Sequence, residues 1–142
     1  MTPHDFHSNV AVALSGCQLV EQELKLYISE ALELVCKCLD GRLPFSMKGQ
    51  DYEDASLERL IDTFRKLNDN VELPLKLRKF KDERNFLSHR AVAYCLDRTG
   101  ELDNQAVATI EERLKAIYPT ARNLCISINE EAYKFRVHLW PD

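Results

Sequence analysis

Apolar residues recur at steps of three and four along most of this chain, which is the spacing of one face of an α-helix. The first stripe predicts a helix over residues 8–39, with Asp5 or Ser8 capping its start and Gly41 closing its end. At 1.5 Å per residue, this helix would be about 48 Å long. Because that is too long for a compact bundle of this size, we expect part of the helix to pack on a second subunit.

A loop and a short helix come next. Residues 40–54 contain two of the four glycines and one proline, so they predict a loop. Asp54 or Ser56 then caps a second helix, whose apolar stripe ends near Leu67. The segment Asn68-Asp69-Asn70 that follows is typical of a turn.

A third helix is predicted to begin near Leu73-Pro74, because proline is tolerated in the first helical turn. Its apolar stripe is interrupted by an arginine, since one face carries Leu77, Phe80, Arg84, Leu87, Ala91 and Tyr94. Burying an unpaired charge is expensive. We therefore expect Arg84 to face a partner, a cleft or a dimer interface.

The last helix is predicted over residues 103–137, with Asp103 as its cap and a kink caused by Pro119 near residues 116–118. Together the four stripes predict an all-α fold: a four-helix up-and-down bundle in which two long helices, the first and the last, bracket two shorter ones. The length of 142 residues suits one domain over residues 1–142.

The chain carries a net charge of −4 and has a pI of about 5.6, so it is not a general binder of polyanions. Its basic residues are nevertheless concentrated. Residues 76–90 hold six positive and two negative side chains, a local charge of +4 against −8 for the rest of the chain. Such a patch can mark a phosphate-binding surface, and it can also be an ordinary solvated helix face.

The five cysteines are odd in number, and no spacing among them resembles a zinc site. We expect most of them to be small core residues in a reducing compartment. The sequence has neither a signal-peptide pattern nor a run of roughly 20 apolar residues, so it predicts a cytoplasmic protein with no membrane contact. No cofactor fingerprint is present, and we expect neither a metal nor a cofactor.

The chemistry of the chain is concentrated in one segment, Glu83-Arg84-Asn85-Phe86-Leu87-Ser88-His89-Arg90. Arginine offers a rigid fork of donors for phosphate oxygens, and histidine has an unperturbed pKa close to neutral pH. On a regular helix Arg84 and His89 lie about 140° apart, so one copy can only place them at the borders of a cleft. Two copies meeting across a two-fold axis would bring two arginines and two histidines to a shared groove.

These residues suit the cleavage of RNA without a metal. His89 would take the proton of the 2′-hydroxyl, and Arg84 would stabilise the charge of the transition state. Asn85 would orient His89 or the phosphate. The other polar residues near the motif would bind the strand: Lys76, Lys79, Lys81, Ser88 and Arg90. The alternative is structural: Arg84 pairs with Glu83, Asp82 or a carboxylate of the last helix, and His89 is an interfacial histidine with satisfied hydrogen bonds.

The segment from Phe80 to Arg90 resembles the signature of the HEPN superfamily (higher eukaryotes and prokaryotes nucleotide-binding). That motif is an arginine, four to six residues and a histidine, often with a polar residue directly after the arginine. Arg84, Asn85 and His89 match those positions. The resemblance implies an all-α bundle that forms homodimers. Many members are metal-independent ribonucleases that act as toxins or in antiviral defence, and others are non-catalytic scaffolds or regulators.

Two functions follow as expectations. The first is a metal-independent endoribonuclease of the HEPN type, related to toxins or defence, with a composite site at a homodimer interface. RNA would be its substrate, and an antitoxin or regulatory protein would be a further partner. The alternative is a non-catalytic, dimeric scaffold, or a regulatory or nucleotide- or nucleic-acid-binding module. The acidic overall charge favours the alternative, and the local basic cluster favours the first.

Overall fold

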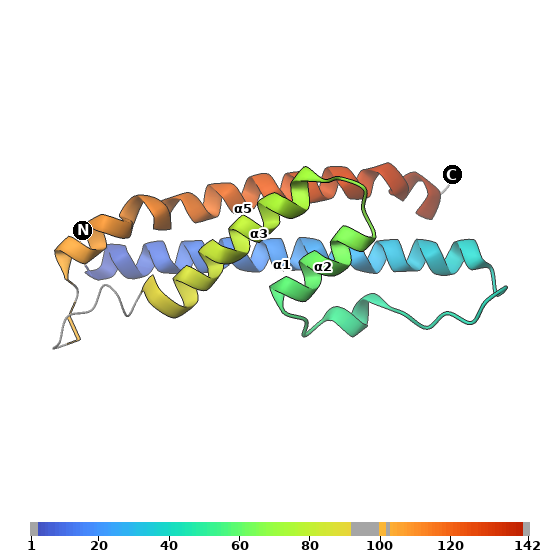
Figure 1. The fold of residues 1–142 in the computed structure, drawn as a ribbon, viewed down its shortest axis with the longest axis horizontal. Coiled ribbons are helices and arrows are strands. Elements are labelled where there is room, and N and C mark those ends of the chain that lie inside the picture. Colours follow the sequence, from blue (N-terminus) through green and yellow to red (C-terminus); the bar gives the residue numbers. More distant parts are fainter. Residues whose placement is uncertain (1–2, 92–99, 102, 141–142) are drawn as a thin grey trace.

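The computed structural model describes residues 3–91, 100–101 and 103–140, and every regular element in these ranges is helical (Figure 1). The elements are α1 (Pro3–Leu39), the 3₁₀ turn η1 (Gly49–Tyr52), α2 (Leu57–Lys66), α3 (Glu72–Phe86), the π-helical turn η2 (Leu87–Ala91) and α5 (Asn104–Leu139). The predicted all-α bundle, with two long helices around two shorter ones, is confirmed. No described helix is long and apolar enough to cross a membrane.

The first helix is longer than predicted at its start. It begins at Pro3 instead of Ser8, and it ends at Leu39 as expected. Gly41 adopts the left-handed conformation (φ 74°) that terminates a helix. Arg42 then donates from Nε to the carbonyl oxygen of Leu39 (3.0 Å), which satisfies one of the last carbonyl groups of α1.

Two predicted caps are present. The hydroxyl oxygen of Ser56 accepts a hydrogen bond from the backbone N–H of Arg59 (3.2 Å) at the start of α2. The carboxylate of Asp103 accepts from the backbone N–H of Gln105 (3.0 Å) at the start of α5. The helix α5 continues through Pro119 without interruption.

The two long helices run side by side in the same direction (Figure 1). Gly16 of α1 lies against Ala121 at the middle of α5, and further along both helices Glu30 of α1 binds Arg136 of α5. The helix directions therefore differ from a strict up-and-down alternation. The segment 40–56 carries the chain back along α1 before α2 begins, so that α3 alone among the described α-helices runs against the two long ones.

The two long helices, α1 and α5, pack against each other along most of their length. They have 37 and 36 residues, and their apolar stripes meet the two short helices in one core, in which Leu24, Phe64 and Phe80 are almost completely buried. The length of α1 is thus matched within the chain and does not require a second subunit.

The cysteines only partly follow the prediction that most are core residues. Cys17 is buried and Cys125 is half-buried, but Cys36 and Cys38 are exposed near the end of α1. They are exposed because the last turns of α1 extend beyond the short helices (Figure 1). Cys95 lies outside the described residues.

A buried polar network joins α1, the turn between α2 and α3, and α5. Glu131 is 7% exposed, and its two carboxylate oxygens accept hydrogen bonds from Asn70 (2.7 Å) and Asn68 (3.3 Å). Lys134 adds an ion pair at 2.8 Å, and Asn68 also donates to the hydroxyl oxygen of Tyr27 (3.0 Å). Burial by itself would raise the pKa of Glu131, but the hydrogen bonds outweigh it and hold this pKa below its usual range.

The close approach of α1 and α5 depends on Gly16. A Cβ atom at this position would lie 3.0 Å from the Cβ atom of Ala121 and 3.2 Å from the Cα atom of Tyr118. We expect Gly16→Leu to lower the free energy of unfolding by about 1–3 kcal/mol, because the new side chain must push α5 away. Urea denaturation would measure this. The matched control is Ser15→Leu at the exposed neighbouring position, and equal stability of the two variants would contradict the prediction.

Candidate functional site

The residues predicted to form the site separate onto two sides of α3. Asn85 and His89 line one hollow of about 430 Å³, together with Asp82, Phe86 and Arg113. Arg84 does not line this hollow and instead forms an ion pair with α1. A single chain therefore brings the amide and the imidazole of the motif together, and it directs the arginine elsewhere.

Arg84 has an intramolecular partner that the sequence did not indicate. Its Nε atom lies 3.7 Å from Oε1 of Glu21, so it pairs with α1 and not with Asp82, Glu83 or the last helix. The pair is loose: it is longer than a good hydrogen bond, and the side chain of Arg84 is 37% exposed. This arrangement solves the problem of an arginine on an apolar stripe without burying an unpaired charge.

Arg84 also lies close enough to Cys17 to affect its ionisation. Burial raises the pKa of the Cys17 thiol to about 11, and the positive charge of Arg84 offsets only part of that rise. The thiol is therefore protonated at neutral pH, and Cys17 is a core residue and not a nucleophile.

Arg113, which sequence reasoning missed, supplies a guanidinium group beside His89. Its Nε and Nη2 atoms donate to the two carboxylate oxygens of Glu83 at 2.7 and 2.9 Å, and these hydrogen bonds raise the pKa of Arg113. The guanidinium carbon lies 3.6 Å from the centre of the Phe86 ring. The remaining nitrogen, Nη1, has no hydrogen-bond partner among the residues that the structure describes, so it is available to a ligand.

His89 lies in the π-helical turn η2, which directly continues α3. Leu87 and Ala91 are buried and anchor the turn in the core, whereas Ser88 and His89 are exposed. In a π turn the hydrogen bonds run from residue i to i+5, and such turns occur often at functional sites. The predicted continuation of this helix to Tyr94 lies outside the described residues.

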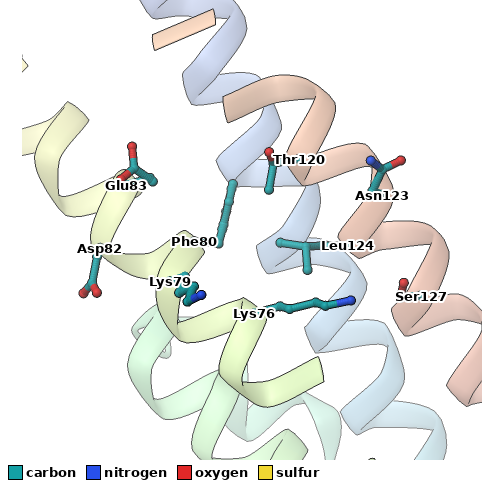
Figure 2. A pocket seen from close by; sticks show the side chains of 9 residues that line it. All are labelled: Lys76, Lys79, Phe80, Asp82, Glu83, Thr120, Asn123, Leu124 and Ser127. Atoms are coloured by element: carbon teal, nitrogen blue, oxygen red, sulfur yellow. The ribbon is translucent and has the colours of Figure 1, made fainter. Parts of the chain in front are cut away.

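The predicted strand-binding residues also separate. Lys76 and Lys79 line a hollow of about 530 Å³ between α3 and α5 (Figure 2). Lys81 lies on the opposite side of α3, where it lines a hollow against α2 together with Arg78. Ser88 is exposed and lines none of these hollows, and the side chain of Arg90 lies outside the described part of the chain.

The arrangement offers acid–base chemistry next to positive charge. His89 can take or give a proton, and Asn85 can donate or accept a hydrogen bond in the same hollow. Arg113 can bind an anionic oxygen there while Glu83 and Phe86 hold its orientation. Across the described residues, no group of three or more His, Cys, Asp or Glu side chains is placed to hold a metal ion.

Comparison of the chain with protein-family models, with curated proteins and with solved structures gave no match.

Proposed function

We propose that this protein is a metal-independent endoribonuclease of the HEPN type, of the kind found among toxins and defence proteins, and that it acts as a homodimer. The observation that carries the proposal is the shared hollow of Asn85, His89 and Arg113. It combines a proton-transfer group with a fixed guanidinium, which are the two components that RNA cleavage without a metal needs.

In the proposed reaction, His89 removes the proton from a ribose 2′-hydroxyl, and the 2′-oxygen attacks the adjacent phosphorus. The bond from phosphorus to the 2′-oxygen forms, and the bond to the 5′-oxygen of the next nucleotide breaks. The 5′-oxygen receives a proton from the same His89, which gained it from the 2′-hydroxyl. The products carry a 2′,3′-cyclic phosphate and a 5′-hydroxyl, and guanidinium groups stabilise the extra charge on the phosphorus-bound oxygens.

Arg84 retains a place in this proposal through its loose ion pair. Because Nε lies 3.7 Å from Glu21 and the side chain is part-exposed, an incoming phosphate can compete with the carboxylate for the guanidinium. A second copy of the chain would bring its own Arg84 to the composite site, beside the Asn85 and His89 of the first copy.

A cleavage assay in EDTA tests the proposal. We expect the wild-type protein to cleave single-stranded RNA and to leave 2′,3′-cyclic phosphate ends. We expect Arg84→Ala to slow the cleavage by about 100-fold, a loss typical of removing one donor to a charged transition state. The control is Arg78→Ala, which removes the same charge from the side of α3 that faces α2. Equal rates for the two variants would exclude Arg84 from the site.

One observation favours the alternative, a non-catalytic dimeric scaffold or regulator. Val12, Leu19 and Leu26 are exposed on α1 at intervals of seven residues, a spacing typical of helix–helix association. Leu19 lies about 200° around α1 from Glu21, so this stripe faces away from Arg84. Absence of cleavage by the wild type, combined with loss of a light-scattering dimer in Leu19→Glu, would support the scaffold in place of the nuclease.

A further inference from the structure

The hollow that contains His89 is the end of a longer groove between α3 and α5. The hollow around Lys76 shares Phe80, Glu83 and Thr120 with a middle hollow of about 290 Å³. That middle hollow shares Arg113 with the hollow of Asn85 and His89. We call this row of three neighbouring hollows the α3–α5 groove. The hydrogen bonds from Arg113 on α5 to Glu83 on α3 cross it beside the middle hollow. From residue 76 to residue 89 along α3, it extends over about 20 Å.

The two walls of the groove differ in chemistry. The α3 wall carries the exposed ammonium groups of Lys76 and Lys79, and Figure 2 shows Lys76 extending from α3 toward α5. The α5 wall carries neutral hydrogen-bonding side chains at i, i+3 and i+7: Thr120, Asn123 and Ser127. One wall can thus neutralise anions, while the other can bind polar groups without adding charge.

The floor of the groove is apolar, and its acidic residues do not oppose an anion strongly. Phe80 and Leu124 lie between the two helices and are 2% and 4% exposed. The carboxylate of Glu83 is already occupied by Arg113 at 2.7 and 2.9 Å. Asp82 lines both the hollow around Lys76 and the hollow of His89, so its carboxylate adds one negative charge at the α3 wall, against the positive charges of Lys76 and Lys79.

A ligand for this groove must be long and narrow, with negative charges along one edge and polar groups along the other. A single strand of RNA has these features, because its phosphates repeat along the chain while its riboses and bases carry donors and acceptors. At the 3.4 Å per phosphate of a stacked strand, the groove accommodates at most about six nucleotides. A protein helix or a small metabolite would not use the whole length of this charged wall.

We propose that the α3–α5 groove binds a single-stranded RNA segment and leads it to His89. Lys76 and Lys79 contact phosphates, and the row of Thr120, Asn123 and Ser127 hydrogen-bonds sugar or base groups. Arg113 binds the phosphate nearest to His89. The identity of the ligand rests on the proposed function, but the binding itself does not require that the RNA be cleaved.

A binding assay with a substrate that cannot be cleaved separates the two proposals. The probe is a fluorescent six-nucleotide 2′-O-methyl oligouridylate, whose blocked 2′-oxygen cannot attack the phosphorus. We expect Lys76→Ala/Lys79→Ala to weaken binding by more than tenfold, and to reduce the slope of log affinity against log salt by about 1.4, or 0.7 for each lost phosphate contact. Both lysines are exposed, so the double variant should keep its helicity.

The matched control is Arg78→Ala/Lys81→Ala, which removes the same charge from the opposite side of the same helix. We expect this variant to bind within about threefold of the wild type. Equal weakening by the two double variants, or no binding by the wild type at low salt, would overturn the groove proposal. Displacement of the probe by duplex RNA as readily as by a single strand would also overturn it. Normal binding without any cleavage of ordinary RNA would instead refute the nuclease proposal and leave the groove proposal standing.

Discussion

Replacing His89 with alanine is expected to reduce RNA cleavage by about 100- to 10,000-fold, the range over which a positioned acid–base group contributes to rate. His89 is exposed in η2, so its removal leaves no cavity and should not change stability by more than about 0.5 kcal/mol. The loss of activity would therefore report chemistry and not folding. Initial rates on single-stranded RNA in EDTA, with circular dichroism of each variant, measure both effects.

A second histidine provides the control for this experiment. His138 is exposed in the last turn of α5, on a part of the helix that is far along the chain from Arg113. His138→Ala should cleave RNA at the wild-type rate. Cleavage by His89→Ala at more than a third of the wild-type rate would remove His89 from the site, and the scaffold alternative would then be favoured.

Glu131→Gln is expected to cause the largest loss of stability among the substitutions considered, about 1.5–3 kcal/mol at pH 7, the range for hydrogen bonds to a charged group. Glutamine has one carbonyl oxygen where the carboxylate has two charged ones. It therefore cannot accept from both Asn68 and Asn70 at full strength, and it loses the ion pair with Lys134. Urea denaturation of the variant and of Glu130→Gln, at the exposed neighbouring position, measures the difference.

The same substitution should change how stability depends on pH. The folded state holds the pKa of Glu131 below its usual value near 4.5, so the ionised carboxylate stabilises the fold above that pH. This contribution is lost as the pH falls from about 4.5 through the lower folded pKa. The difference in unfolding free energy between wild type and Glu131→Gln should therefore be constant near neutrality and shrink in acid. A difference that grows as the pH falls would contradict the buried hydrogen-bond network around Glu131.

The regular part of the fold could be predicted because it depends on local spacing. The apolar stripes identified four helices, and the caps Ser56 and Asp103 fixed two of their starts within a residue. The direction of α5 relative to α1 could not be predicted, since it depends on where the segment 40–56 leads the chain and not on any helical period. The buried Glu131 was missed for a similar reason: an acidic residue between apolar positions is ordinarily solvated, and its partners lie about 60 residues away.

The candidate site, too, could be predicted only as far as local sequence patterns reach. Helical periodicity placed Arg84 on the apolar stripe, but no local signal indicated that Glu21 would meet it from α1. Likewise Arg113 lies 30 residues from Glu83, and nothing in its neighbourhood distinguishes it from the other charged residues of α5. The separation of Lys81 from Lys76 and Lys79 follows directly from their spacing on α3. Which face of α3 packs against α2 and which against α5 can be seen only in the folded structure.

The parallel pairing of α1 and α5 has a consequence for the order in which the chain folds. Contacts such as Glu30 with Arg136 join residues 106 positions apart, so the pairing must close a very long loop. During synthesis α1 emerges well before α5, its main partner. Until α5 is made, the apolar stripe of α1, including Leu24 and Ile28, has no long helix to pack on. We infer that α2 and α3 pair early and that docking of α5 completes the fold, which makes the nascent chain more dependent on chaperones than a bundle of sequential hairpins.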